Sequence, residues 1–225
     1  EIPLRLVGSE MCIRDRPFEQ SANAVMKGSD NLLSFHFFFL RKLFFVKEAD
    51  ALVLCPGGFG TLDEALEVIT LIQTGKSPLV PVILLDEPNG TFWQGLLDYI
   101  QQNLDSNGYI LSSDMNLMHL VHDAESAAQE IDRFYANFHS SRWLKDQFVV
   151  RMRHALNEAA LAQLNLQFSD LCKHGDIQQQ RTGDERIDGP ELCELPRLLF
   201  AFSGRNAGRL RELLDVINQP EHWLS

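Results

Sequence analysis

The feature that most constrains the fold of this chain is an apolar run followed at once by a glycine-rich turn and a helix start. Residues 51–55 read Ala-Leu-Val-Leu-Cys and predict a buried strand. Residues 56–64, Pro-Gly-Gly-Phe-Gly-Thr-Leu-Asp-Glu, hold three glycines in four positions, which permits positive φ and close approach to a ligand. A helix from about Thr61 would offer free N–H groups and a positive dipole end to a phosphate. Glu64, one turn inside that helix, places a carboxylate beside this possible phosphate-binding site, so the segment indicates nucleotide chemistry.

Glycine-rich turns between a strand and a helix are common, and this one could be only a tight turn. The G-x-G-x-x-G dinucleotide spacing and the G-x-x-x-x-G-K-[ST] phosphate loop are both absent. The full string Pro-Gly-Gly-x-Gly-Thr-x-x-Glu is far more specific, and it resembles the defining motif of the LOG family of nucleotide 5'-monophosphate phosphoribohydrolases. Arg41-Lys42 matches the second motif of that family, and the similarity continues through residues 67–76 and 81–85. It covers residues 17–136 well and the remainder only loosely.

This resemblance implies hydrolysis of the N-glycosidic bond of a nucleoside 5'-monophosphate, which gives free base and ribose 5-phosphate. It implies that Arg41 and Glu64 are catalytic residues. The substrate-binding residues that follow from it are Lys42, Gly57, Gly58, Gly60, Thr61 and Glu67. It also implies a homodimer, with the helix after the glycine loop near the interface.

The chemistry of such a cleavage explains these residue types. The reaction passes through a ribosyl cation, which gains from a nearby carboxylate and is attacked by an activated water. Glu64 would supply the negative charge, and Glu67 lies three residues later on the same side of the helix. Arg41 could clamp a phosphate or orient Glu64, because guanidinium stays charged and binds oxygen pairs. An ordinary surface role remains the alternative for Glu67 and for Lys42.

Two other functions can be compared with this one. The older label of the family, "lysine decarboxylase-like", does not suit the chain, because decarboxylases normally use pyridoxal phosphate on a lysine and no lysine here has a convincing cofactor pocket. We therefore expect no cofactor, and we expect metal-independent catalysis because the sequence shows no metal-ligand cluster. A non-catalytic nucleotide-binding or sensing module with a Rossmann-like fold is the alternative. The Arg41 and Glu64 pair favours the enzyme.

The acidic balance of the chain limits its partners. Lys and Arg number 20 against 31 Asp and Glu, a formal net charge of −11. A nucleic-acid polymer or a membrane is therefore not expected as a partner, whereas a mononucleotide needs only local positive potential. The four cysteines have no C-x-x-C spacing, which favours reduced thiols and a cytoplasmic protein. Cys55, at the end of an apolar strand, is expected to be a small core residue.

The start of the chain differs from the rest. Residues 1–16 have no clear period and resemble translated sequencing-adapter read-through, so we expect them to be non-native; a real but irregular arm is the alternative. Pro17 would then correspond to the middle of a long-form family member. On that basis earlier strands and a first glycine-rich loop of the nucleotide-binding domain are expected to be missing from this chain.

The remaining segments alternate between strand and helix patterns. Strands are expected at 32–39, 51–55, 80–85, 110–111 and 117–121, and helices at 41–49, 61–74, 92–104 and 123–135. This order predicts an α/β fold, a Rossmann-like doubly wound parallel sheet that is incomplete at the N-terminus and forms a LOG-like domain over residues 17–136. Ligands of such sheets bind at the carboxyl ends of the strands.

Residues 137–225 are expected to form a C-terminal extension. The pattern predicts continued helix over 134–166, a flexible polar loop over 173–189, and a terminal strand–helix unit over 198–202 and 207–217. Arg205, Arg209 and Arg211 form a local basic group on this unit. A solvated helix face is the preferred interpretation, and a phosphate or effector site is the alternative.

Overall fold

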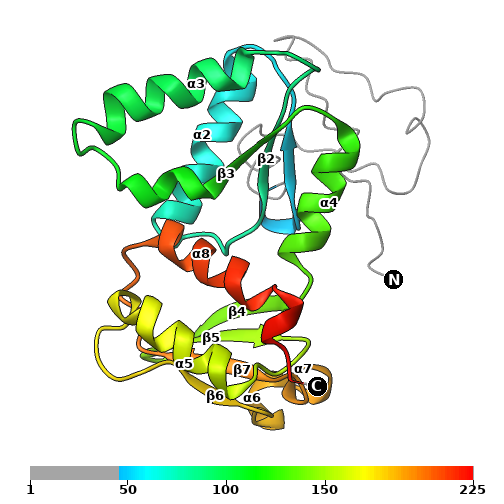
Figure 1. Ribbon diagram of the computed structural model, residues 1–225, viewed down its shortest axis with the longest axis vertical. Helices are drawn as coiled ribbons and strands as arrows, with labels where there is room; N and C mark the ends of the chain where they lie inside the picture. The colour runs from blue at the N-terminus through cyan, green and yellow to red at the C-terminus, as the bar shows by residue number, and fades with distance from the viewer. Residues whose placement is uncertain (1–45, 225) are drawn as a thin grey trace, which may run out of the picture.

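A computed structural model describes residues 46–224, which form two sheets with their helices, one above the other in Figure 1. The first sheet is parallel, with the order β1 (Leu52–Leu54), β2 (Val82–Leu85), β3 (Met118–Val121). Its helices are α2 (Phe59–Gln73), α3 (Phe92–Ile100) and α4 (Ala124–Phe134). The predicted α/β fold with a parallel sheet is confirmed. The expected strand at 32–39, residues 1–16, and Arg41 and Lys42 lie outside the described residues.

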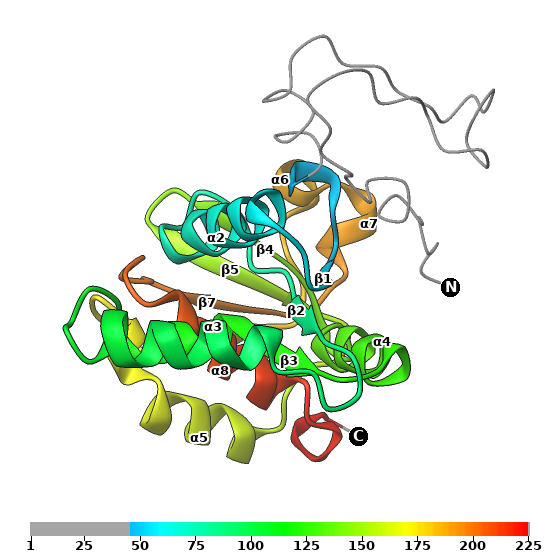
Figure 2. The ribbon, with the colours of Figure 1, turned by 90° about the horizontal axis from the view of Figure 1, so that it is seen from above.

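The alternation of side chains along the strands explains how the helices cover the sheet. Val82 and Leu84 pack with residues of α2 and α3 on one face of the sheet. On the other face, Ile83 packs with Val121 of β3 and Ala127 of α4. Figure 2 shows α2 and α3 on one side of the sheet and α4 on the opposite side. A strand buried on both faces has a continuous apolar sequence, as β2 does.

Helix α2 begins two residues before the expected start, at Phe59, with Gly58 as its N-cap. Its predicted end at Gly75 is confirmed. Gly75 has a φ of 68°. Its N–H donates to the carbonyl of Ile72, and the N–H of Lys76 donates to that of Leu71. These two bonds form the Schellman motif, which needs a left-handed residue at this position.

Two details of the first half differ from the sequence expectation. The expected strand at 110–111 is wrong. These residues form no strand and lead directly into a 3₁₀ helix, η2 (Ser112–Leu117). The buried carboxylate of Asp114 accepts a hydrogen bond from the N–H of Leu111 at 3.0 Å, which turns the chain there. Helix α3 continues as a π-helical turn, η1 (Gln101–Asp105), so the helical segment ends close to its predicted limit.

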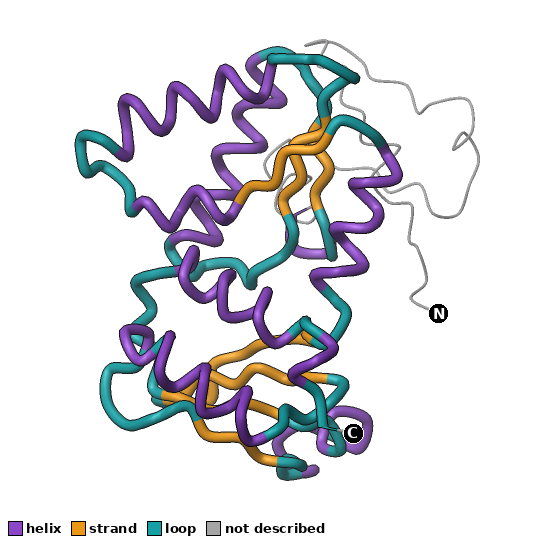
Figure 3. Tube along the Cα trace, viewed as in Figure 1, coloured by secondary structure: helices purple, strands orange, loops and turns teal. Residues whose placement is uncertain are grey.

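The second half is an antiparallel sheet with the order β4 (Phe138–Leu144), β5 (Gln147–Met152), β7 (Arg197–Phe200), β6 (Gln178–Gln180). Its helices are α5 (Glu158–Gln167), α6 (Glu185–Asp188), α7 (Pro190–Cys193) and α8 (Ala207–Ile217). The 3₁₀ turns η3 (Ser169–Leu171) and η4 (Pro220–His222) complete it. Figure 3 shows its strands apart from those of the parallel sheet.

The continuous helix expected over 134–166 is wrong, because β4 and β5 form a hairpin there. Lys145, in the two-residue turn between the strands, has a φ of 54°, which suits a tight hairpin turn. Phe148, Val149 and Val150 are aromatic or β-branched and are buried in the sheet. The polar segment 173–189 is also more than a loop. It contains β6, which pairs with β7.

Helix α8, whose predicted bounds are confirmed, joins the two halves. Gly208 lies so close to η2 that an added Cβ would be 1.9 Å from the carbonyl oxygen of Ser113. The buried guanidinium of Arg211 donates to Glu130 of α4 at 2.6 Å. A solvated face is therefore wrong for Arg211. Arg209 pairs with Asp170 at 3.2 Å and with Glu212.

Candidate active site

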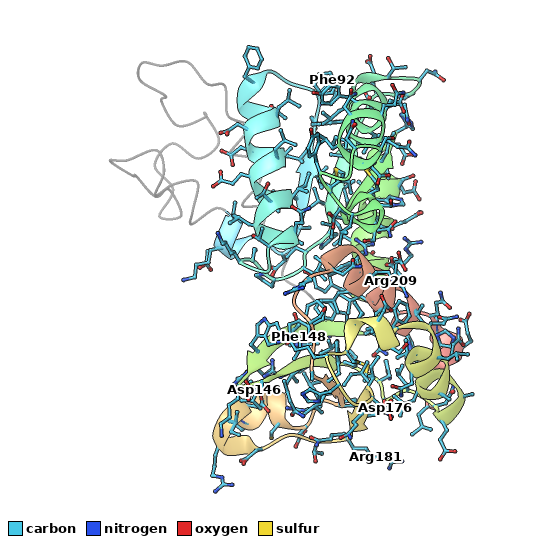
Figure 4. The ribbon with its side chains drawn as sticks, turned by 90° about the vertical axis from the view of Figure 1, so that its left-hand side faces the viewer. Phe92, Asp146, Phe148, Asp176, Arg181 and Arg209 are labelled. Carbon is cyan, nitrogen blue, oxygen red and sulfur yellow. The ribbon has the colours of Figure 1, made fainter. Side chains whose placement is uncertain are left out.

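The glycine loop lies at the carboxyl end of the parallel sheet, where such folds bind ligands. This end faces away from the antiparallel sheet. Phe92, the first residue of α3 after β2, is labelled at this end in Figure 4. Residues 55–58 connect the end of β1 to the start of α2 within four positions. The predicted strand, glycine turn and helix are all present, and they place the loop at an edge of the sheet that solvent can reach.

The reason for glycine in this loop is close packing at Gly57 and not the positive φ that the pattern indicated. The residues with positive φ in the described chain all lie elsewhere, and Gly58 has a φ of −89°. A Cβ on Gly57 would lie 2.2 Å from the hydroxyl oxygen of Thr61. Nothing lies within 4 Å of a Cβ built on Gly58, so the space above that residue is open.

The first turn of α2 presents N–H groups beside the loop. The N–H of Leu62 makes the first helical bond, to the carbonyl of Gly58 at 3.2 Å. The N–H groups of Phe59, Gly60 and Thr61 precede that bond, so helix geometry gives them no acceptor. Gly58 is the N-cap residue and, as a glycine, has no side chain that could accept a hydrogen bond from them. Three donors at the positive end of a 15-residue helix form the arrangement that binds phosphate in other proteins.

The two candidate carboxylates lie further along α2. Glu64 is only 8% exposed, and Glu67 is half-buried one turn later. Thr61, Glu64 and Glu67 are spaced by three residues, so consecutive members are neighbours on the helix surface. Asp63, in contrast, is exposed. The structure therefore brings together the hydroxyl, the loop donors and a buried carboxylate within two turns of one helix.

Asp86 is a residue at this end of the sheet that the sequence analysis missed. It follows β2 directly, is 4% exposed, and accepts hydrogen bonds from the N–H groups of Glu87 and Trp93 at 2.9 and 3.2 Å. Gly90 must be a glycine, because a Cβ would lie 2.1 Å from the Asp86 carboxylate. Asp86 thus fixes the loop that borders the site. An aspartate directly after a buried strand was the available signal.

Further expectations concern residues near the site and the described chain as a whole. Arg41 and Lys42 lie outside the described residues, so their roles beside Glu64 stay predictions. Cys55 is exposed and is not the core residue that was expected, because the chain leaves the sheet at this position. Within residues 46–224 no group of three or more His, Cys, Asp or Glu side chains is placed to hold a metal ion. The same residues contain no helix long and apolar enough to cross a membrane.

Comparisons with known proteins support the family that the motif indicated. A family model described as "Possible lysine decarboxylase" matches residues 9–131, more than half of the chain. A cytokinin riboside 5'-monophosphate phosphoribohydrolase of Arabidopsis thaliana, LOG7, is 32% identical over 44% of this chain and 43% of its own length. A probable enzyme of the same name from Oryza sativa subsp. japonica, LOGL3, is 32% identical over 42% of this chain and 43% of its own.

The chain thus spans less than half the length of these curated relatives. The family model nevertheless spans the motif at residues 56–64, and the structure places that motif at the carboxyl edge of a parallel sheet. The chain belongs to the family described as "Possible lysine decarboxylase", which is the LOG family.

Proposed function

We propose that the protein hydrolyses the N-glycosidic bond of a nucleoside 5'-monophosphate and releases free base and ribose 5-phosphate. The observation that carries this proposal is the position of Glu64, a buried carboxylate one turn beyond three N–H donors at the start of α2. The donors suit the 5'-phosphate, and the carboxylate suits the positive charge that develops on the ribose. The names of the curated relatives describe the same kind of reaction.

The proposal assigns a role in the reaction to each part of the site. The N–H groups of Gly60 and Thr61 and the Thr61 hydroxyl hold the phosphate, and the open space over Gly58 lets it approach the backbone. Glu64 stabilises the ribosyl cation, and Glu67 contributes further negative charge. Arg41, with Lys42 beside it, adds positive charge against the phosphate or orients Glu64. Water attacks the anomeric carbon, and the base leaves with the bonding electron pair and takes up a proton.

The test is release of ribose 5-phosphate from a panel of nucleoside monophosphates. Glu64→Gln removes the charge but keeps the shape, so turnover should fall by about a hundredfold or more. Asp63→Asn is the matched control, since Asp63 precedes Glu64 on the same helix but is exposed. This change should leave turnover within about twofold. The assay is run on the 225-residue chain and on a chain extended with the family elements expected before residue 17.

The alternative of a nucleotide-sensing module is decided by the same assay. If the extended chain binds a monophosphate but releases no ribose 5-phosphate, the enzyme proposal fails and the sensing module takes its place. If Glu64→Gln and Asp63→Asn have equal effects on turnover, Glu64 is not the catalytic carboxylate. Equal binding of the nucleotide by both variants, with turnover lost only in Glu64→Gln, supports the assignment.

We also propose that the protein is a cytoplasmic homodimer with α2 near the interface. Phe59 is 93% exposed, and Leu66, two turns later on the same side of the helix, is also exposed. Two apolar side chains on one side of a helix suit burial against a second copy. Light scattering during gel filtration should give twice the chain mass. Leu66→Glu should reduce that mass towards the monomer, whereas a wild type that elutes as a monomer at all concentrations would contradict the proposal.

A further inference from the structure

A cavity of about 370 Å³ lies between the two halves of the protein, at the opposite end of α2 from the glycine loop. Its walls come from the turn around Gly75, from β4 and β5, and from the start of α8. Phe148, which is one of the lining residues, is labelled in Figure 4 near the boundary between the halves. Cavities that bind small molecules begin at about 300 Å³ and often lie between domains. The size and the position of this cavity therefore suit a small ligand.

The wall that β4 and β5 contribute is one face of the antiparallel sheet. Ser141 and Trp143 lie two positions apart on β4, so they share this face, and Phe148 lies opposite Trp143 on β5. Arg142, between them, points to the other face, where its guanidinium lies 3.6 Å from Asp188. The charge of Arg142 is therefore directed away from the cavity, and this wall offers aromatic rings and one hydroxyl group.

An incompletely buried indole forms part of this wall. The ring of Trp143 stacks on that of Phe202 with centroids 5.8 Å apart, and Phe148 packs edge-on against it at 5.2 Å. Phe148 and Phe202 are buried, but Trp143 is 44% exposed. Gly204 lines the cavity beside the indole and has no side chain that would cover it. A supported indole with exposed surface suits stacking by a planar ring.

The wall at the end of α2 offers hydrogen-bond acceptors. The carbonyl groups of a helix point towards its C-terminal end, and those of the last turn have no partner within the helix. The turn after α2 donates N–H groups to the carbonyls of Leu71 and Ile72. Within residues 46–224 no N–H group donates to the carbonyl oxygens of Gln73 and Thr74, and both residues line the cavity. A ligand with N–H donors therefore suits this wall, which is also the negative end of the helix dipole.

The charges around the cavity favour a ligand without a net charge. The described residues that line it include no Asp or Glu, so a cation has no counter-charge there. Lys76, which is exposed, opposes a cation further. A single exposed lysine also contributes little to the binding of an anion, because solvent and salt screen its charge.

We infer that this cavity binds an uncharged, amino-substituted heteroaromatic ring. The ring stacks on Trp143, and its amino group donates to the carbonyl oxygens at the end of α2. The free base that the proposed hydrolysis releases can belong to this class, but the site is separate from the glycine loop. Helix α2 has 15 residues, so its two ends lie about 20 Å apart. The inference therefore does not depend on the proposed hydrolysis.

The test labels the chain with 5-fluorotryptophan and follows its three tryptophans by ¹⁹F NMR during titration with adenine. Trp143→Phe assigns the signal of the cavity. Trp93 is fully buried near the glycine-loop end, where its indole N–H donates to the carbonyl of Leu85, so its signal reports binding there. We expect a saturable shift of the Trp143 signal. A Trp143 signal that does not move at millimolar adenine overturns the inference, and a shift of Trp93 alone does so without affecting the proposed hydrolysis.

A matched pair of ligands tests the hydrogen bond. 6-Methylpurine has the shape of adenine but carries a methyl group in place of the amino group. It should bind about fivefold more weakly, because one hydrogen bond to the end of α2 is lost. The shift of the Trp143 signal measures both affinities. Equal affinities would show that the carbonyl oxygens do not recognise the amino group, and would overturn the inference.

Removal of the indole tests the stacking. Trp143→Leu should weaken adenine binding, measured by calorimetry, by about tenfold, because stacking of a base on an aromatic ring contributes this much. Trp143→Phe keeps a ring and should lose less. Trp223→Leu is the matched control, because Trp223 is half-buried and stacks on His154 but does not line the cavity, and it should bind as wild type does. An unchanged Trp93 signal verifies that each variant is folded. Equal affinity of Trp143→Leu and wild type overturns the inference.

Discussion

Arg151 of β5 and Arg197 of β7 are directly opposed in the antiparallel sheet, and the carboxylate of Asp188 pairs with both guanidinium groups. All three side chains are at most 6% exposed. Like charges on opposed strand positions repel each other, so the sheet needs the aspartate at this point. Burial alone would raise the pKa of Asp188, but hydrogen bonds from Arg151 and Arg197 outweigh it and hold the pKa below its ordinary value.

Asp188→Asn should destabilise the protein strongly. The change leaves two buried arginines without a counter-charge, which typically costs about 3–5 kcal/mol. Urea unfolding at pH 7 measures the free energy. Asp184→Asn is the matched control, because Asp184 pairs with the exposed Arg186 and with no other cation of residues 46–224, and it should have little effect. Equal unfolding midpoints for the two variants would show that the buried pair contributes no more than a surface one.

Stability should fall in mild acid through His139. Burial lowers the pKa of this imidazole, and the charges of Arg153 and Arg151 lower it further. The unfolded chain, with an ordinary pKa of about 6.5, therefore takes up a proton before the folded protein does. The contribution of His139 is fully present above that value and is lost as the pH falls from it towards the folded pKa.

The measurement is urea unfolding of wild type and His139→Gln between pH 8 and pH 5. The difference in free energy between them should change in favour of the variant as the pH falls. A constant difference over this range would mean that the folded and unfolded pKa values of His139 are the same.

Gly208→Ala should loosen the contact between α8 and η2. A Cβ would lie 1.9 Å from the backbone carbonyl oxygen of Ser113, and a backbone atom cannot rotate away. Overpacking of this kind costs about 1–3 kcal/mol. Gly95→Ala in α3 is the control, because nothing lies within 4 Å of its added Cβ. Helix propensity predicts that this second change stabilises by about 0.5–1 kcal/mol. Thermal unfolding curves of both variants should shift in opposite directions.

Local pattern predicted most elements of the first half of the fold, apart from the strand expected at 110–111, and it predicted α8. Each apolar strand there is followed by its own helix, and Gly75 and Asp123 mark helix ends in the sequence. The hairpin of β4 and β5 could not be found in this way, because β5 is stabilised by β7, which lies almost fifty residues later. The burial of Arg211 likewise depends on Glu130, which is 81 positions away. Long-range partners of this kind leave no local signal.

Prediction of the candidate site from sequence was limited in the same way, because one of its contacts forms only in the folded chain. The motif correctly indicated a glycine turn that leads into a helix. The sequence of the motif did not show that position 57 must be glycine to leave room for the Thr61 side chain. That close approach depends on the start of α2 at Phe59. The positions of Thr61, Glu64 and Glu67 follow from helix spacing alone. The catalytic and binding roles given to them remain predictions.

Gly57→Ala should therefore impair the proposed reaction through Thr61. The added Cβ would lie 2.2 Å from the Thr61 hydroxyl oxygen, so this side chain must rotate away. Thr61 is half-buried and short, so its rotation should change the free energy of unfolding by about 0.5 kcal/mol or less. We expect kcat/KM for the best monophosphate to fall about tenfold, which is the loss of about 1.4 kcal/mol of transition-state binding.

A double-mutant cycle with Thr61→Val identifies the route of this effect. If Gly57→Ala acts by displacing the hydroxyl, the double variant Gly57→Ala/Thr61→Val should be no slower than Thr61→Val alone, because the hydroxyl is already absent. Gly95→Ala in α3 serves as the control, since its Cβ also meets open space and Gly95 is not a residue of the proposed site. Additive losses in the cycle would mean that Gly57 acts on the substrate directly and that the close contact with Thr61 has no role in the reaction.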